Sequence, residues 1–145
     1  MKNIIDQFTT VKNVAIIGVS RNNNKWGSAL MNDLIKGGYN VVPVNPFASE
    51  IRGIKAYKTI NDIPQNIENV IIALPSTKAI EILSNMDNKN IKRIWVDIKH
   101  DKAKQLPVAI ELAKAKGLVV ISKYCPLMFM YTRGPHKFHK AILNF

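Results

Sequence analysis

The chain has 145 residues and a mass of 16.3 kDa, and 47% of its residues are hydrophobic and 21% charged. This length and balance are typical of one folded domain with a buried core, not of a disordered chain. No apolar run is long enough to span a membrane, no N-terminal stretch has the pattern of a secretory signal, and a single cysteine excludes an internal disulfide. We therefore expect one domain covering residues 1–145, with no membrane partner and a cytoplasmic location.

The chain is basic, because 21 Lys and Arg side chains against 10 Asp and Glu give a formal net charge of +11. The excess lies in residues 1–60 and 101–145, where basic residues are interspersed with apolar ones. A basic surface attracts polyanions in general, such as nucleic acids, anionic membranes and phosphorylated small molecules. Since nucleic-acid-binding arms usually show a block of Lys and Arg, we do not expect a nucleic-acid partner.

The first half of the chain alternates strand and helix patterns. In chain order it predicts a short helix in residues 1–11, a strand at 14–17, a helix at 28–36, a strand at 40–44 and a loop at 46–69 with an extended piece at 51–54. The strands are continuous apolar runs, which are typical of strands covered on both faces. The helix pattern at 28–36 ends at Gly37-Gly38, a common helix stop.

The second half continues this alternation. It predicts a strand at 70–74, a helix at 76–86, a strand at 94–96, a helix at 107–116, a strand at 118–121 and a tail at 124–145 with a helix-like pattern. Ser76 or Thr77 is a candidate N-cap, and Pro107 suits the first turn of its helix. The alternation predicts an α/β fold, a Rossmann-like doubly wound parallel sheet of five strands. We assign its strands the order 3-2-1-4-5.

The end of the first predicted strand has the composition of a phosphate site. Ligands of doubly wound sheets bind beyond the carboxyl ends of the strands, where the strand order reverses. There the chain reads Gly18-Val19-Ser20, and a polar loop from Arg21 to Gly27 leads into the first long helix. Small residues let a phosphate approach the backbone, Arg21 and Lys25 add positive charge, and Ser20 adds a hydroxyl donor. The alternative is an ordinary strand-to-helix turn.

The residues at the end of the second predicted strand help to distinguish between two classes of nucleotide-binding site. Dinucleotide sites use the pattern Gly-x-Gly-x-x-Gly and place an acid after the second strand to hold the ribose. Here Ser20 stands at the second glycine, and Asn45-Pro46 follows the strand with no acid before Glu50. Because a carboxylate repels phosphate and an amide does not, this end favours a nucleotide with an additional phosphate, although Asn45-Pro46 also fits a plain turn. An NAD(P)-binding redox sensor or oxidoreductase-like module is the alternative.

Short motifs along the chain form the pattern of a known family. They are Val14 to Ser20, Lys25-Trp26-Gly27, Gly38 to Pro46, Ile51-Arg52-Gly53 with Ala56-Tyr57, Asp62-Ile63-Pro64, Ala73-Leu74-Pro75 and Tyr124-Cys125-Pro126. With these motifs the chain resembles the small single-domain CoA-binding proteins, whose fold is similar to the CoA-binding domain of the succinyl-CoA synthetase alpha subunit. The resemblance covers nearly the whole chain, and it implies that the ligand is coenzyme A or an acyl-CoA.

The resemblance also implies which residues bind the ligand. They are Gly18, Ser20 and Lys25 at the pyrophosphate, Asn45 and Pro46 at the adenosine, Arg52 at the 3′-phosphate, and Leu74, Pro75 and Ser76 on the adenine or pantetheine side. We add Val19, Arg21 and Gly27 of the same loop to the predicted cofactor-binding residues. After the fourth strand the family often has a Gly-rich or Gln-bearing loop, whereas this chain has Asp97-Ile98-Lys99-His100-Asp101. The preference for an acyl group is therefore left open.

Residues that suggest other chemistry have simpler interpretations. Cys125 suggests a nucleophile or a mixed disulfide with the CoA thiol, but free cysteines are more often small buried hydrophobes. His136 and His139 lack the further ligands of a metal site, and the adjacent pair His100-Asp101 seldom faces one another on a loop. No acid–base set with a partner emerges. We therefore expect CoA binding without catalysis and without a metal.

The apolar stretch Met128-Phe129-Met130-Tyr131 lies outside the strand–helix alternation. Such a stretch either caps the sheet of its own chain or is buried in a contact between two copies. The sequence leaves both alternatives open, so a homodimer is one of the expected states.

Overall fold

The computed structural model describes residues 2–87, 90–97 and 104–130. Its helices are α1 (Lys2–Thr10), α2 (Trp26–Lys36), α3 (Ser76–Asn85), α4 (Leu106–Ala115) and α5 (Leu127–Met130), with a 3-10 turn η1 at Ile60–Asp62. Its strands are β1 (Asn13–Ile17), β2 (Asn40–Val44), β3 (Glu50–Ile51), β4 (Ile54–Lys55), β5 (Asn69–Ile72), β6 (Arg93–Val96) and β7 (Val119–Ile121). The five predicted strands and the four predicted helices before the tail are confirmed, each within two residues at either end.

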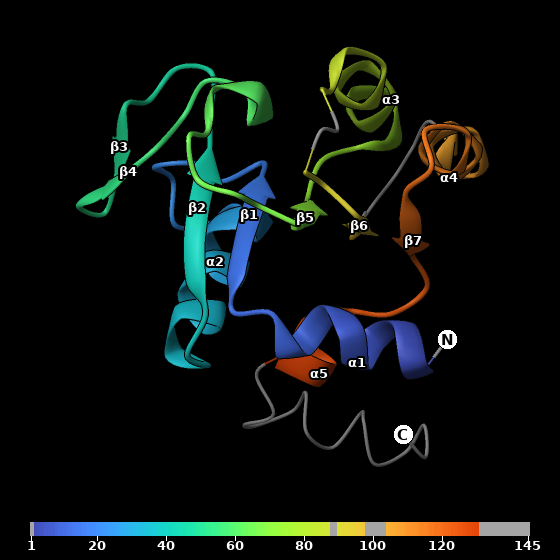
Figure 1. The fold of residues 1–145 in the computed structure, drawn as a ribbon. Helices are drawn as coiled ribbons and strands as arrows, with labels where there is room; N and C mark the ends of the chain where they lie inside the picture. The colour runs from blue at the N-terminus through green and yellow to red at the C-terminus, as the bar shows by residue number, and fades with distance from the viewer. Residues whose placement is uncertain (1, 88–89, 98–103, 131–145) are drawn as a thin grey trace.

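The five longer strands form one parallel sheet in the order β2-β1-β5-β6-β7 (Figure 1). Counted along the chain, this order is 2-1-3-4-5, so the Rossmann-like α/β class is confirmed and the predicted order 3-2-1-4-5 is wrong. The predicted order would place the third strand at an edge. That strand, β5, pairs with β1 on one side and β6 on the other, and all four of its residues are buried. A strand covered in this way belongs inside a sheet, and the strand order therefore reverses between β1 and β5.

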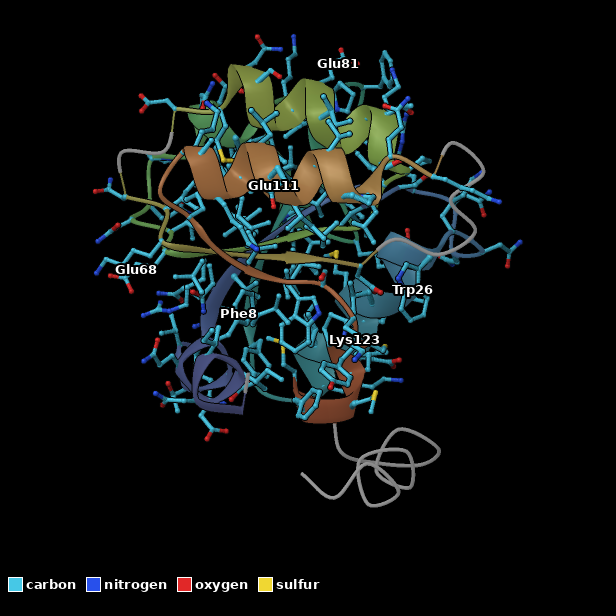
Figure 2. All side chains as sticks on the ribbon, turned by 90° about the vertical axis from the view of Figure 1, so that its right-hand side faces the viewer. Phe8, Trp26, Glu68, Glu81, Glu111 and Lys123 are labelled. Carbon is cyan, nitrogen blue, oxygen red and sulfur yellow. The ribbon has the colours of Figure 1, made fainter. Side chains whose placement is uncertain are left out.

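Helices cover both faces of this sheet. In Figure 2, α3 and α4 lie on one side of the strands, and α1, α2 and α5 lie on the other. The two-residue alternation along β1 explains this arrangement. Val14 and Ile16 belong to the buried cluster on the α2 side, whereas Ala15 and Ile17 belong to the cluster on the α3 side. Because β1 is packed on both faces, its carboxyl end has a fixed position.

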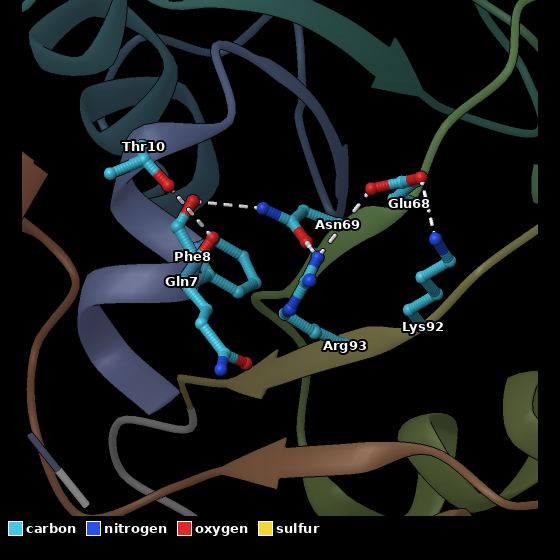
Figure 3. A network of polar contacts seen from close by, with 7 residues as sticks. All are labelled: Gln7, Phe8, Thr10, Glu68, Asn69, Lys92 and Arg93. Atoms are coloured by element: carbon cyan, nitrogen blue, oxygen red, sulfur yellow. Dashed lines mark hydrogen bonds and ion pairs between the residues drawn. The ribbon is translucent and has the colours of Figure 1, made fainter. Parts of the chain in front are cut away.

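A polar network ties α1 to the amino end of the sheet (Figure 3). The buried Asn69 amide donates to the Phe8 carbonyl oxygen at 2.8 Å, and its Oδ1 accepts from Arg93 at 3.1 Å. Glu68 accepts a hydrogen bond from Lys92 at 2.9 Å and pairs with Arg93 at 3.6 Å. The Lys92 hydrogen bond lowers the pKa of the Glu68 carboxyl below its ordinary value. These bonds close the end of the sheet that is opposite to the carboxyl ends of the strands.

The short helix α5 packs against α1 and α2. Met128 and Met130 are buried, and the Trp95 indole N–H donates to the Tyr124 carbonyl oxygen at 2.8 Å just before the helix. The described part of the apolar stretch therefore caps the core of its own chain. Tyr131 and the helix-like pattern of the tail lie outside the described residues, and the homodimer stays a prediction.

Candidate functional site

Two glycines bring the end of β1, the end of β5 and the start of α2 together. Gly18 has a φ of +109°, and a Cβ placed on it would lie 2.5 Å from the Ala73 carbonyl oxygen. A Cβ on Gly27 would lie 2.2 Å from the Gly18 carbonyl oxygen. Since real Cβ atoms do not approach backbone oxygens so closely, only glycine fits these two positions without a shift. Gly18 and Gly27 therefore set the close approach of strand and helix at the point where the strand order reverses.

The loop between β1 and α2 is held by its own hydrogen bonds. The Ser28 hydroxyl accepts from the Ser20 N–H at 3.1 Å and donates to the Ser20 carbonyl oxygen at 2.5 Å. The Ser20 hydroxyl accepts from the Asn22 N–H, and the Asn22 side chain accepts from the Asn24 N–H, each at 3.0 Å. These bonds fix the loop from within the chain itself, which lowers the entropy that binding of a ligand would lose.

The helix that follows this loop presents a positive end. Helix α2 begins directly after Lys25, whose side chain makes no capping hydrogen bond, and its first turn contains no acidic residue. Lys25 and Arg21 are both exposed in the loop that leads into the helix. The first N–H groups of a helix and its dipole favour an anion at this position, and the two cations strengthen that preference.

Asn45 braces the loop after β2 against the loop after β1. Its amide donates to the Val19 carbonyl oxygen at 2.8 Å, and its Oδ1 accepts from the N–H groups of Phe47 and Ala48 at 2.7 and 2.9 Å. The side chain thus connects two strand ends that are 26 residues apart in the sequence. The neighbouring Pro46 is exposed, and the Phe47 ring is 89% exposed.

Arg52 joins the β3–β4 hairpin to the same loop. It lies at the turn of the hairpin with a φ of +53°, next to Gly53, and the hairpin stands beyond the β2 edge in Figure 1. Its guanidinium donates to Asn32 of α2 and to Asn23 of the β1–α2 loop. The structure therefore brings Arg52 beside the loop that the sequence predicts to hold the pyrophosphate.

The three binding residues predicted at the end of β5 differ in their burial and contacts. Leu74 packs on Gly18, since its Cγ would lie 3.0 Å from a Cβ placed on Gly18, and Pro75 is exposed as the residue before α3. Ser76 is fully buried, and its hydroxyl accepts from the Gln105 N–H at 3.0 Å. The Ser76 side chain therefore connects α3 to the start of α4.

Sequence reasoning missed one pair of residues at these strand ends. The Trp26 indole N–H donates to Oδ2 of Asp97 at 2.5 Å, and Asp97 is only 6% exposed directly after β6 (Trp26 is labelled in Figure 2). The Asp97 N–H also donates to the Ile72 carbonyl oxygen at 2.9 Å. The two residues are 71 positions apart, so no local motif contains both. The sequence signal was a carboxylate directly after an apolar strand.

The remaining candidate residues are Cys125, the histidines and the pair His100-Asp101. Cys125 is half-buried and packs against the core cluster on the α2 side. His100, Asp101, His136 and His139 lie outside the described residues. In residues 2–87, 90–97 and 104–130, no three His, Cys, Asp or Glu side chains gather as they would around a metal ion. In these same ranges, no helix is both long and apolar enough to cross a membrane.

The sheet order, the glycine-built turn and the positive start of α2 define a Rossmann-like α/β domain with a candidate anion site at its switch point. The sequence profile of the CoA binding domain matches residues 12–131, and the chain belongs to this family. This membership confirms the family that the sequence motifs indicate.

Curated relatives and solved structures agree with this family. The chain is 28% identical over 142 residues to the alpha subunit of acetate–CoA ligase [ADP-forming] I of Pyrococcus furiosus, an alignment that covers 86% of this chain and 31% of the relative. The chain spans less than a third of the curated relatives that it matches. Among solved structures it resembles a hypothetical protein from Pyrococcus horikoshii OT3 (TM-score 0.77, 25% identity) and Prb, the PH1109 protein redesigned for binding (TM-score 0.75, 27% identity). Each similarity covers 99% of this chain and 92% of the other.

Proposed function

We propose that this chain binds coenzyme A or an acyl-CoA at the carboxyl ends of β2, β1 and β5, and that residues 1–145 act as one binding unit without chemistry of their own. The observation that carries the proposal is the prefolded loop between Gly18 and Gly27, which ends at the uncapped positive start of α2. In a member of the CoA binding domain family, an anion site at this position suits the diphosphate of CoA.

The diphosphate would bind at the β1–α2 loop. Gly18 is half-buried and has no side chain to exclude a phosphate, Val19 is buried beside it, and the Ser20 hydroxyl, which accepts from Asn22, still has its own proton to donate. Arg21 and Lys25 would supply positive charge. Gly27 acts indirectly, because its lack of a side chain lets α2 start against Gly18.

The adenosine with its 3′-phosphate would lie at the end of β2. Asn45 fixes the end of β2 through its hydrogen bond to the Val19 carbonyl oxygen. Pro46 and the exposed Phe47 ring offer surfaces on which a purine stacks. Arg52 is bound to two neutral amides, Asn23 and Asn32. Because a guanidinium binds phosphate more strongly than it binds an amide, the 3′-phosphate is a better partner for Arg52 than either asparagine.

The pantetheine chain would pass the end of β5. Leu74 and Pro75 offer apolar surface there, and the buried Ser76 fixes the start of α3 through its hydrogen bond from the Gln105 N–H. The proposal of binding without catalysis rests on the sequence, in which no acid–base set with a partner emerges. A serine nucleophile requires an adjacent general base, and the Ser20 hydroxyl is bonded to the Asn22 N–H of its own loop.

Parallel thermal unfolding with CoA, acetyl-CoA, NAD, ATP and duplex DNA tests the ligand class. A ligand present at about 100 times its dissociation constant stabilises the folded chain by about 2.7 kcal/mol, which raises the Tm by about 5–11 °C for a domain of this size. We expect this shift with CoA and its thioester and a smaller one with NAD. Stabilisation by NAD without stabilisation by CoA would favour the dinucleotide alternative and contradict the proposal.

Two pairs of variants test the assigned positions by isothermal titration of CoA. Lys25→Gln removes a loop cation and should weaken CoA binding about tenfold, whereas Lys114→Gln removes a remote exposed cation of α4 and should not. Arg52→Asn keeps a residue that tolerates a positive φ, and it should reduce the preference for CoA over 3′-dephospho-CoA. Equal losses for Lys25→Gln and Lys114→Gln would indicate a general charge effect instead of a phosphate site.

A further inference from the structure

The two edges of the parallel sheet differ in whether another segment of the chain pairs with them. At the β2 edge, the Tyr57 N–H donates to the Pro43 carbonyl oxygen at 3.1 Å, and the Asn45 N–H donates to the Tyr57 carbonyl oxygen at 2.8 Å. Pro43 itself has no N–H to offer at this edge. The β2 edge is therefore covered by the segment that directly follows the β3–β4 hairpin.

The opposite edge is β7, beside which the described part of the chain places no further strand. The Val119 N–H donates to the Lys92 carbonyl oxygen at 3.0 Å, so the backbone groups of Val119 face β6. Since successive residues of a strand direct their backbone groups to opposite sides, the N–H and the C=O of Val120 face outward. Outward groups of this kind are a template to which another strand can pair.

The β7 edge also has exposed apolar side chains next to it. Four large hydrophobic side chains of the described residues are exposed, and two of them are Val108 of α4, at 55%, and Val119 of β7, at 37%. Figure 1 shows α4 and β7 together at the end of the sheet away from β2, and Figure 2 views the molecule from that end. An edge strand with exposed valines beside it is typical of a surface that pairs with another chain.

The charge around this edge indicates which kind of chain it accepts. Residues 104–130 contain four lysines and a single acidic residue, Glu111, which pairs with Lys114 at 4.0 Å. Lys123 is exposed two residues after the end of β7 (labelled in Figure 2). Because positive surfaces bind complementary negative ones and repel positive ones, this edge favours an acidic partner.

A second copy of this chain fits the edge less well. Two copies paired through β7 would bring together two chains of net charge +11 and their two lysine-rich segments. Net charge of one sign keeps chains apart, and lysines near an edge strand oppose pairing with a strand of the same charge. An acidic strand meets no such repulsion.

We propose that the β7 edge is a docking site for an extended acidic segment of a partner protein, which pairs with β7 as an additional strand. The backbone of this segment would bond to the N–H and C=O of Val120, its alternate apolar side chains would contact the exposed valines, and its carboxylates would lie near Lys123. The site is separate from the proposed CoA site, because β7 and β2 form opposite edges of the sheet. This proposal therefore does not depend on CoA binding.

A blocked hexapeptide of alternating glutamate and valine tests the proposal by isothermal titration with the whole chain at pH 7. The same peptide with lysine in place of glutamate should bind at least about tenfold more weakly, a difference of about 1.4 kcal/mol. The acidic peptide with a methyl group on every backbone nitrogen has lost its N–H donors and should also bind at least about tenfold more weakly. With the unmodified acidic peptide, hydrogen exchange of the Val120 N–H should slow at least about tenfold, and that of the bonded Val119 N–H less than about twofold.

Two variants test the residues of this edge. Val120→Pro removes the outward N–H at a position where an edge strand tolerates proline, and it should weaken binding of the acidic peptide at least about tenfold. Lys123→Gln should weaken binding about threefold, whereas the control Lys78→Gln, which removes an exposed cation of α3, should leave it unchanged. If Val120→Pro does not fold, the N-methylated peptide tests the same hydrogen bond on the wild-type chain.

Three results would overturn the proposal. The first is equal affinity for the acidic and the lysine peptide, or exchange of the Val120 N–H that the acidic peptide leaves unchanged. The second is displacement of the acidic peptide by CoA, which would place the peptide at the β1–α2 loop. The third is a dimer in sedimentation velocity that Val120→Pro abolishes, which would assign the edge to a second copy of the chain.

Discussion

Replacing Gly27 with alanine tests the close packing at the start of α2. In an unobstructed helix this change stabilises by up to about 1 kcal/mol, because alanine has the better helix propensity. In this chain the added Cβ would lie 2.2 Å from the Gly18 carbonyl oxygen and 2.7 Å from its carbonyl carbon. Ordinary contacts between carbon atoms are about 3.5–4.0 Å, so the first turn of α2 has to move by about 1 Å.

The cost of this movement exceeds the gain in propensity. Forced repacking in a close-packed region costs about 1–3 kcal/mol, and the upper end applies because both clashing atoms belong to the backbone. With the propensity gain subtracted, we expect a net loss of about 2 kcal/mol, which lowers the Tm by about 4–8 °C. The displacement also moves the helix start away from the position assigned to the diphosphate, so CoA binding should weaken as well.

Gly38→Ala is the matched control for this experiment. Its φ of +93° makes alanine unfavourable by about 1–2 kcal/mol, but nothing lies within 4 Å of the added Cβ, and the position follows the opposite end of α2. Circular dichroism should show a lower Tm for both variants, and titration should show weaker CoA binding for Gly27→Ala alone. A Tm for Gly27→Ala above that of the wild type, as propensity alone predicts, would refute the packing argument.

Three further variants test other parts of the molecule. Asn45→Asp keeps the acceptor for Phe47 and Ala48 but loses the donor to the Val19 carbonyl oxygen. Urea unfolding should show a free energy of unfolding lower by about 1–3 kcal/mol, and titration should show a lower ratio of CoA to NAD affinity. No change in either quantity would contradict the role given to Asn45. Phe47→Ala should weaken CoA binding about tenfold with an unchanged Tm, because it removes an exposed stacking surface, and equal affinity would remove Phe47 from the site. Glu68→Gln should lower stability at pH 7, since a lowered carboxyl pKa stabilises the fold above its ordinary value of 4.5; this difference should disappear as the pH falls through the lowered pKa, and a difference that grows in acid would contradict the sign.

The identity of the strands could be predicted from the sequence, but their order could not. Each strand contains a short apolar run, and the burial of Val70, Ile71 and Ile72 in β5 agrees with a strand covered on both faces. The residues of β5 alone do not show whether the strand pairs with β1, as it does, or lies beyond β2. That choice depends on contacts between segments more than 50 residues apart, such as Val14 opposite Asn69. Periodicity therefore predicts the layers of the fold and leaves the sheet order undetermined.

The residues of the candidate site could likewise be only partly described from the sequence. The position of the loop from Gly18 to Lys25 between a strand and a helix could be predicted because its small, polar and basic residues lie in one short segment. The sequence singled out Asn45 as a binding residue, which stays a prediction, and the structure shows that its amide and its oxygen both bond to backbone groups. Ser76 stays a predicted ligand contact, and the structure shows its side chain buried with a hydrogen bond from the Gln105 N–H. Asp97 accepts a hydrogen bond from Trp26, which is 71 residues away in the sequence. A local sequence pattern cannot predict such a pair.

A crystal structure of the chain grown with CoA is the most direct measurement of the central claim. We expect the diphosphate to lie between Ser20 and the first turn of α2 and the adenosine to lie beside Asn45. A CoA molecule bound away from the carboxyl ends of β2, β1 and β5, with the β1–α2 loop making no contact to phosphate, would contradict it.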